Sequence, residues 1–211
     1  HGTSRGLGDV YKRQVKRFLL EYKRENSLED SLIKLCENVL TSVKDNYSLI
    51  VLDEKQTSFN KPVISALLAT SAIHNYLIKN NERVSCNIIV NTASARDTHQ
   101  IACLIGFGAT CVHPWLGLQT VLKIGKQREL ESPGNELCAS YRKSLNNGLL
   151  KIMSKMGISN ISSYRGAGLF EVVGFSEKVN KVCFPKNETL IFGDCFKDLE
   201  RKLLEVIDSD K

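Results

Sequence analysis

Few residues of this 211-residue chain have the type and spacing that catalysis needs. His74, His99 and His113 belong to no H-E-x-x-H motif, and the chain contains no G-x-S-x-G nucleophile motif. The glycine pairs in GFGAT (106–110) and RGAGLF (165–170) fit neither a dinucleotide-binding nor a P-loop pattern. GFGAT most simply ends a helix, whereas RGAGLF is also suited to bring the start of a helix close to an anion. The chain thus shows no self-contained catalytic constellation.

The seven cysteines also argue against a metal or disulfide framework. Their number is odd, and no two of them are spaced C-x-x-C. Most lie in apolar stretches such as LIKLCENVL and HQIACLIGFG. This pattern predicts reduced, buried thiols in a cytoplasmic protein, without a zinc site or an iron–sulfur cluster built from these spacings.

One loop is rich in small and polar side chains, and it follows a predicted strand. It reads Asn-Thr-Ala-Ser-Ala-Arg-Asp (91–97), and His113 ends the next predicted strand. Ligands of parallel α/β folds gather at such carboxyl ends of strands. The candidate contacts to a ligand or a neighbouring domain are Asn91, Thr92, Ser94, Arg96 and Asp97. The alternative is plain helix capping with an Arg96–Asp97 surface pair.

The elements that would position this loop alternate along the chain. Short continuous apolar runs predict buried strands at 47–53, 85–91 and 109–114. Apolar residues at helical spacing predict helices at 27–45, 62–81, 96–108, 115–124, 136–156, 167–174 and 194–210. The order strand, loop, helix, strand predicts an α/β fold with parallel strands and helical crossovers.

Composition and charge set the outer limits. With 42% hydrophobic and 25% charged residues the chain is an ordinary globular sequence, and no apolar run is long enough to span a membrane. Residues 1–24 hold seven basic and two acidic residues, which is most of the net charge of +6. The total is therefore no argument for nucleic-acid binding. We expect 1–14 to be a non-native leader, 15–26 a basic N-terminal segment and 27–211 one domain.

A family resemblance appears in the segment NNGLLKIMSKMGISNISSYRGAGLFEVVGFSEKV (146–179). It closely resembles the large subunit of glutamate synthase, whose run has the form GLLKxMSKMGIS…SYRGA…FEAVGL. The resemblance continues through residues 87–120 and 48–78 and spans about 27–208 in one collinear order. The sequences TASARD and LIGFGAT are most similar to those of the bacterial, NADPH-dependent type. Lys155, Tyr164 and Arg165 of this segment join the candidates for a tunnel or domain interface.

The resemblance implies the central domain of that enzyme, with a fold akin to a partial (β/α) barrel. In the family, an amidotransferase domain releases ammonia, which travels through a tunnel to a domain with FMN and an iron–sulfur cluster and is combined with 2-oxoglutarate to give glutamate. This chain would be the scaffold between those two domains and a candidate wall of the tunnel. It would bind no cofactor itself, would be inactive alone, and would work with a small NADPH-oxidising subunit.

Two departures and two alternatives accompany this resemblance. The family usually has Glu where Asn91 stands, and Leu-Ser-Asp-Arg where this chain has Leu-Asp-Glu-Lys (52–55). The tail after Phe184 also lacks the usual Gly-Thr-x-Ser-Arg-Ile. The first alternative function is a stand-alone α/β ligand-binding module. The second, nucleic-acid binding, depends on the charge of residues 1–24 alone.

Overall fold

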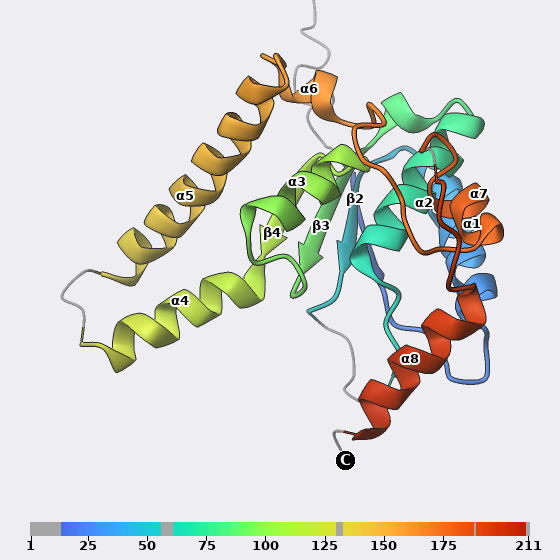
Figure 1. Ribbon diagram of the computed structural model, residues 1–211, viewed down its shortest axis with the longest axis horizontal. Helices are drawn as coiled ribbons and strands as arrows, with labels where there is room; N and C mark the ends of the chain where they lie inside the picture. Colours follow the sequence, from blue (N-terminus) through green and yellow to red (C-terminus); the bar gives the residue numbers. More distant parts are fainter. Residues whose placement is uncertain (1–13, 56–60, 130–132, 188, 210–211) are drawn as a thin grey trace, which may run out of the picture.

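A computed structural model describes residues 14–55, 61–129, 133–187 and 189–209. The expected leader, 1–14, lies outside the described residues except for Gln14. Four parallel strands pair strictly in chain order (Figure 1): β1 (Gln14–Leu19), β2 (Tyr47–Asp53), β3 (Asn87–Thr92) and β4 (Cys111–Pro114). The predicted α/β fold with parallel strands is therefore confirmed.

Three helices make the crossovers between successive strands: α1 (Leu28–Lys44), α2 (Ala66–Lys79) and α3 (Thr98–Gly106). Right-handed crossovers that always step in one direction put their helices on one face of the sheet. This is the winding of a (β/α) barrel, although β1 and β4 do not pair with each other in the described part of the chain. The sheet is thus consistent with a partial barrel and is open.

The hydrophobic core lies between that face and the crossover helices. Ile50, Leu52, Ile88 and Val90 have no exposed surface and alternate with partly exposed neighbours along β2 and β3. The helices supply the other side of the core, with Leu32, Val39, Ala69, Ile73 and Leu77 all fully buried. The apolar runs that predicted β2 and β3 are therefore explained by burial of alternate residues beneath helices.

Strand β1 was not predicted; it runs from Gln14, the last residue of the expected leader, into the segment 15–26 that was expected to be only basic. Five of its six residues are exposed, and its sequence QVKRFL lacks the continuous apolar run that marked the other strands. An edge strand pairs on one side only and tolerates charged residues such as Lys16 and Arg17. Hydrogen bonding to β2, and not burial, makes this segment a strand.

The second half of the chain is helical, with one wrong prediction. Residues 167–174 form no helix, and RGAGLF starts none. The helix lies further on, in the polar stretch SEKVNKV (176–182). There the Ser176 side chain accepts a hydrogen bond from the Val179 N–H and so caps the start of the helix. The remaining elements are the short helix η1 (Arg83–Ser85), α4 (Trp115–Gln127), α5 (Gly134–Lys155), α6 (Ile161–Tyr164), α7 (Glu177–Cys183) and α8 (Phe196–Ser209).

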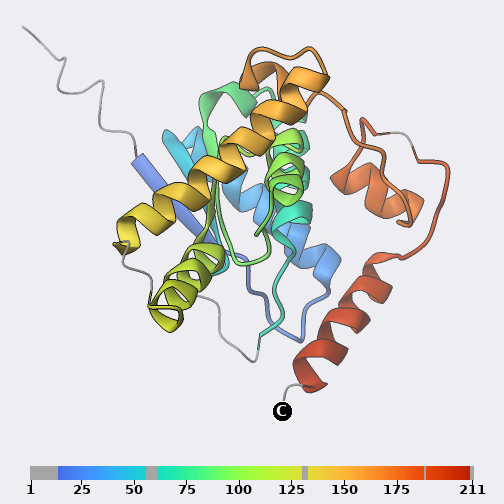
Figure 2. The ribbon, with the colours of Figure 1, turned by 60° about the vertical axis from the view of Figure 1, so that its left-hand side comes forward.

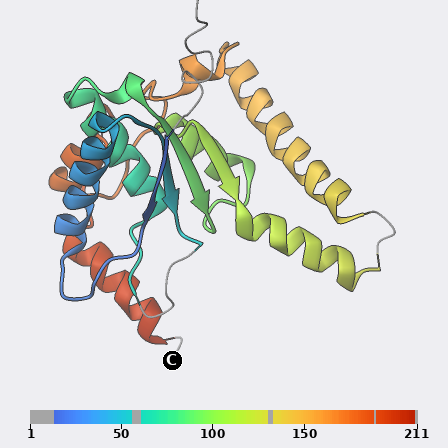
Figure 3. The same cartoon turned by 180° about the vertical axis from the view of Figure 1, so that it is seen from behind.

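Helices α4 and α5 form an arm that stands away from the sheet. In Figures 2 and 3 the arm, yellow-green to orange, lies on the opposite side of the molecule from α8. Its helices bury little: α4 has only Gly117 and Gly125 buried, and α5 has only Met153. The arm is joined to the body where α5 packs against α3.

Candidate functional site

Polar residues form a row at the carboxyl edge of the sheet. Asp53 of β2 is in register with Asn91 of β3, which is in register with His113 of β4. Residues in register on parallel strands project to the same face. This face is the one that carries no crossover helix, because Leu52 and Val90, one position earlier, point into the helical core.

An ion pair and two hydrogen bonds connect this row across all four strands. The Arg17 guanidinium lies 3.0 Å from Asp53 Oδ2, and Asn91 Nδ2 donates to Asp53 Oδ1 at 2.7 Å. His113 Nδ1 lies 2.7 Å from Asn91 Oδ1. Since the Asn91 amide presents its oxygen to the ring, His113 Nδ1 is the donor. The Lys55 N–H also donates to Asp53 Oδ1 at 2.7 Å, so a fully buried carboxylate fixes the backbone of Lys55 directly after β2.

A second buried carboxylate organises the loop after β3. Glu54 accepts hydrogen bonds from the Thr92 hydroxyl at 2.6 Å, from the Ala93 N–H at 2.8 Å and from the Ser94 hydroxyl at 3.3 Å. Thr92 is completely buried. The predicted candidates Asn91, Thr92 and Ser94 thus lie together and are held by two carboxylates, Asp53 at the end of β2 and Glu54 directly after it.

Asp97 fits the alternative interpretation of the loop, in which this residue caps a helix. Asp97 is the N-cap of α3, in a capping box with Gln100. The Arg96 carbonyl accepts a hydrogen bond from the Tyr141 hydroxyl at 2.7 Å, which ties the loop to α5. No Arg96–Asp97 ion pair occurs among the described residues. Asp97 thus fixes the start of α3, and Arg96 fixes the loop against α5, at the edge of the polar row.

The other three candidates lie apart from this row. Tyr164 is 1% exposed, and burial, followed by the nearby Cys103, raises the pKa of its hydroxyl. The residue after Arg165 donates its N–H to the carbonyl of Gly106, at the far end of α3. Lys155 is exposed at the last residue of α5. The predicted set therefore divides between two regions of the molecule.

A histidine clamp lies in that second region. His74 is 8% exposed, and its Nδ1 accepts a hydrogen bond from Arg83 Nε at 2.9 Å. A Cβ at Gly108 or Gly166 would lie within 2.6 Å of the imidazole ring, so both positions need glycine. Burial, and then the charges of Arg83, Lys186 and Arg165, lower the pKa of His74 to about 4. The imidazole is neutral at physiological pH and acts as a structural linker.

A cysteine–histidine contact on α3 does not form an activated nucleophile. Cys103 Sγ lies 3.6 Å from His99 Nε2, one helical turn away. Burial and then the charge of Asp97 raise the pKa of the thiol, which disfavours the thiolate that would be reactive. Within the described ranges there is also no group of three or more residues suited to hold a metal ion.

A cavity of about 470 Å³ opens beside the polar row, between β4 and the arm. Its walls include Val112, His113, Pro114, Leu118, Tyr141 and Leu145. Of the polar groups at this edge, the loop 91–97 and the place of His113 at the end of a strand were predicted from the sequence. Asp53 and Glu54 carried a signal as acids that follow an apolar run, whereas nothing in the sequence pointed to Arg17, 36 residues before its partner.

These features define a class of protein: a parallel (β/α) domain in which the polar groups of the carboxyl edge pair with one another and order two loops. The family model for the glutamate synthase central domain matches residues 6–176. The chain therefore belongs to the glutamate synthase central-domain family. The match begins ahead of β1 and ends before α7, which leaves the divergent tail outside it.

Relatives with different electron donors in their names are similar to this chain. A ferredoxin-dependent glutamate synthase of Arabidopsis thaliana is 36% identical over 213 residues, which cover 94% of this chain and 13% of the relative. The glutamate synthase [NADPH] large chain of Azospirillum brasilense is 37% identical over 180 residues, 85% of this chain and 12% of the relative. The NADPH type indicated by the sequence is thus among them, and the chain spans about an eighth of the length of these proteins.

Replacement of Asn91 by Asp tests the polar row. N91D removes the donor to Asp53 and sets a second carboxylate beside it, so we expect a loss of about 2 kcal/mol in the free energy of unfolding at pH 7. The repulsion raises a carboxyl pKa in the folded state, so the loss is largest above that pKa and shrinks as the pH falls through it. Urea denaturation of N91D and the parent chain at pH 7 and pH 4.5 measures both effects.

The matched control for this experiment is N147D. Asn147 is exposed on α5, and its side chain makes no hydrogen bond to another described residue. The same change there sets a carboxylate four residues from both Lys143 and Lys151, so it should leave the unfolding free energy unchanged or raise it by up to about 1 kcal/mol. An equal loss in both variants would contradict the role of Asn91 as the bridge between Asp53 and His113.

The neutral state of His74 predicts acid sensitivity. The unfolded chain binds a proton at His74 near pH 6.5 and the folded chain only near pH 4, so stability falls as the pH drops across this window. The expected contribution is up to about 3 kcal/mol. Denaturation midpoints between pH 4 and 7 should show a smaller slope for H74Q, which retains an acceptor for Arg83 but does not titrate. Identical slopes would refute this assignment.

Proposed function

We propose that this chain is the middle segment of a glutamate synthase large subunit and holds an amidotransferase domain and an FMN domain at a fixed spacing. The complete enzyme would form glutamate from 2-oxoglutarate and the ammonia of glutamine, as an oxidoreductase. The observation that carries the proposal is the family match over residues 6–176. The polar row supports it, because Asp53 is held by an ion pair to Arg17 and a hydrogen bond from Asn91.

The carboxyl edge is our candidate for a wall of the ammonia route. Thr92, Ala93 and Ser94 present small, uncharged side chains, and Glu54 fixes their positions through hydrogen bonds. Such a wall must exclude water and keep its shape while a small neutral molecule passes. A buried carboxylate that accepts several hydrogen bonds gives the loop this rigidity.

The cofactors and partners of the proposed enzyme would reside outside this segment. FMN and the iron–sulfur cluster belong to the FMN domain in this proposal, and a small subunit would oxidise NADPH. The location would be the cytoplasm. No helix within the described ranges combines the length and the hydrophobicity that a membrane span requires.

The alternative function, a stand-alone ligand-binding module, has one observation in its favour. The cavity of about 470 Å³ beside His113 is of the size that small molecules occupy, and it lies at the carboxyl edge where ligands of parallel sheets bind. Coding sequence for amidotransferase and FMN domains on either side of this segment would exclude that alternative. A start codon and a stop codon close to the segment would favour it.

The first test of the proposal uses the chain alone. A scaffold segment should form no glutamate from glutamine and 2-oxoglutarate, with either NADPH or reduced ferredoxin as the electron donor. The measurement is glutamate formation above a boiled-protein background. Turnover by the isolated chain would overturn the proposal, because the chemistry would then reside in these 211 residues.

The second test uses the full-length subunit that carries this segment. Replacement of the exposed Ser94, which is hydrogen-bonded to Glu54, by Trp sets a bulky side chain on the candidate wall of the ammonia route. Glutamine hydrolysis should continue, while glutamate formation should fall at least fivefold and free ammonia should accumulate. The matched control is T41W, at an exposed position of α1. A ratio of ammonia released to glutamate formed that is equal in S94W and the parent enzyme would contradict the tunnel role.

A further inference from the structure

The outer face of α5 carries positive charge at regular spacing. Lys143, Asn147, Lys151 and Lys155 follow one another at four-residue steps, which places them along one face of the helix. All four are exposed. Lys151 and Lys155 are a like-charge pair at the i, i+4 spacing, which weakens a helix when it stands alone.

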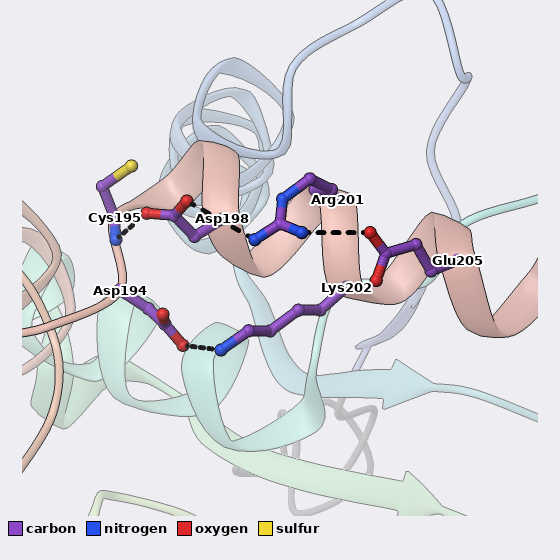
Figure 4. A network of polar contacts seen from close by, with 6 residues as sticks. All are labelled: Asp194, Cys195, Asp198, Arg201, Lys202 and Glu205. Atoms are coloured by element: carbon purple, nitrogen blue, oxygen red, sulfur yellow. Dashed lines mark hydrogen bonds and ion pairs between the residues drawn. The ribbon is translucent and has the colours of Figure 1, made fainter.

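The contrast with α8 is direct (Figure 4). There Arg201 pairs with Glu205 at 3.0 Å and lies 4.0 Å from Asp198, while Lys202 pairs with Asp194. Two of the three cations of α8 are therefore compensated by nearby acids, and Lys197 is in no described ion pair. Among the described ion pairs, none includes a lysine or arginine of residues 115–157.

The arm differs from the rest of the chain in its net charge. Residues 115–157 contain seven lysines and arginines but only three glutamates. The remaining residues after position 24 have a slight excess of acids. The positive charge of the part that resembles the family is thus concentrated on the arm, which stands away from the body (Figure 1).

Exposed apolar side chains accompany these lysines. Leu150, which follows Asn147 by three and Lys143 by seven residues and so lies beside them on α5, is 61% exposed, and Met156, next to Lys155, is 44% exposed. Aliphatic groups bordered by cations suit a protein interface with a polar rim. The outer face has no aromatic residue on which the bases of a nucleic acid would stack.

We propose that the outer face of α5, defined by Lys143, Asn147, Leu150, Lys151 and Lys155, docks onto an acidic and partly apolar surface of a neighbouring domain of the same subunit. The proposal depends on the proposed function, because that function supplies the neighbouring domain. Acidic groups of that domain neutralise the lysines, and Leu150 packs against its apolar surface. The arm would thus be the attachment point of the scaffold.

Carbodiimide cross-linking of the full-length subunit tests the contact. This reagent joins a lysine amine to a carboxylate only where the two already touch. We expect peptides that link Lys143, Lys151 or Lys155 to aspartates or glutamates outside this segment. Lys34, Lys44 and Lys79, exposed on α1 and α2, are the internal controls and should give no such links.

Matched triple variants test the energetics. In 50 mM NaCl, K143S/K151S/K155S should make the junctions between domains at least fivefold more sensitive to limited proteolysis, whereas K34S/K44S/K79S should match the parent subunit. In 1 M NaCl the parent subunit should become as sensitive as the α5 variant, because salt screens the same charges.

Three outcomes would overturn this inference. They are cross-links from α5 that stay within the segment, equal proteolytic sensitivity of the two triple variants, and tight binding of a 20-base-pair DNA by the parent chain that the α5 substitutions abolish. An active subunit whose α5 gives no external cross-link refutes the docking alone. A gene without flanking domains refutes the proposed function as well, so the two failures are distinguishable.

Discussion

The fully buried Asp53 carboxylate is the constraint around which the carboxyl edge is arranged. A charge removed from water needs several partners, and Asp53 finds them in Arg17 of β1, Asn91 of β3 and the Lys55 N–H of its own loop. Asn91 can serve both neighbours because an amide donates and accepts at once. A glutamate at position 91 would offer Asp53 no donor when ionised, so Asn91 and Asp53 form one compatible pair.

Burial decided which parts of the fold were predictable. Ile50, Leu52, Ile88 and Val90 are buried beneath helices, and their strands were found from apolar runs. Arg17 lies on an edge strand that hydrogen bonding defines, and neither the strand nor its ion pair left a local pattern. The helix placed at 167–174 was wrong because apolar content was given more weight than the cap at Ser176, which starts the real helix α7.

In the candidate site, too, residues marked by a local sequence pattern were predicted, and their partners from distant parts of the chain were not. The loop 91–97 was recognised because polar residues cluster after a strand, and its Asp97 proved to cap α3, as the alternative reading required. The partners of that loop are Asp53, the last residue of β2, and Glu54, which follows it, nearly 40 residues earlier in the sequence. Tyr164 and Arg165 were grouped with the loop by resemblance alone, and the fold separates them because Gly166 is bonded to the other end of α3.

The strictly sequential strand order has a consequence for biosynthesis. Each strand pairs only with strands adjacent in the chain, so β1 and β2 can join before β3 has left the ribosome, and β4 can add last. Contacts between elements close in sequence cost little loop entropy and favour rapid folding. A segment of this kind can be completed while later domains are still unmade, and it offers them a finished surface when they emerge.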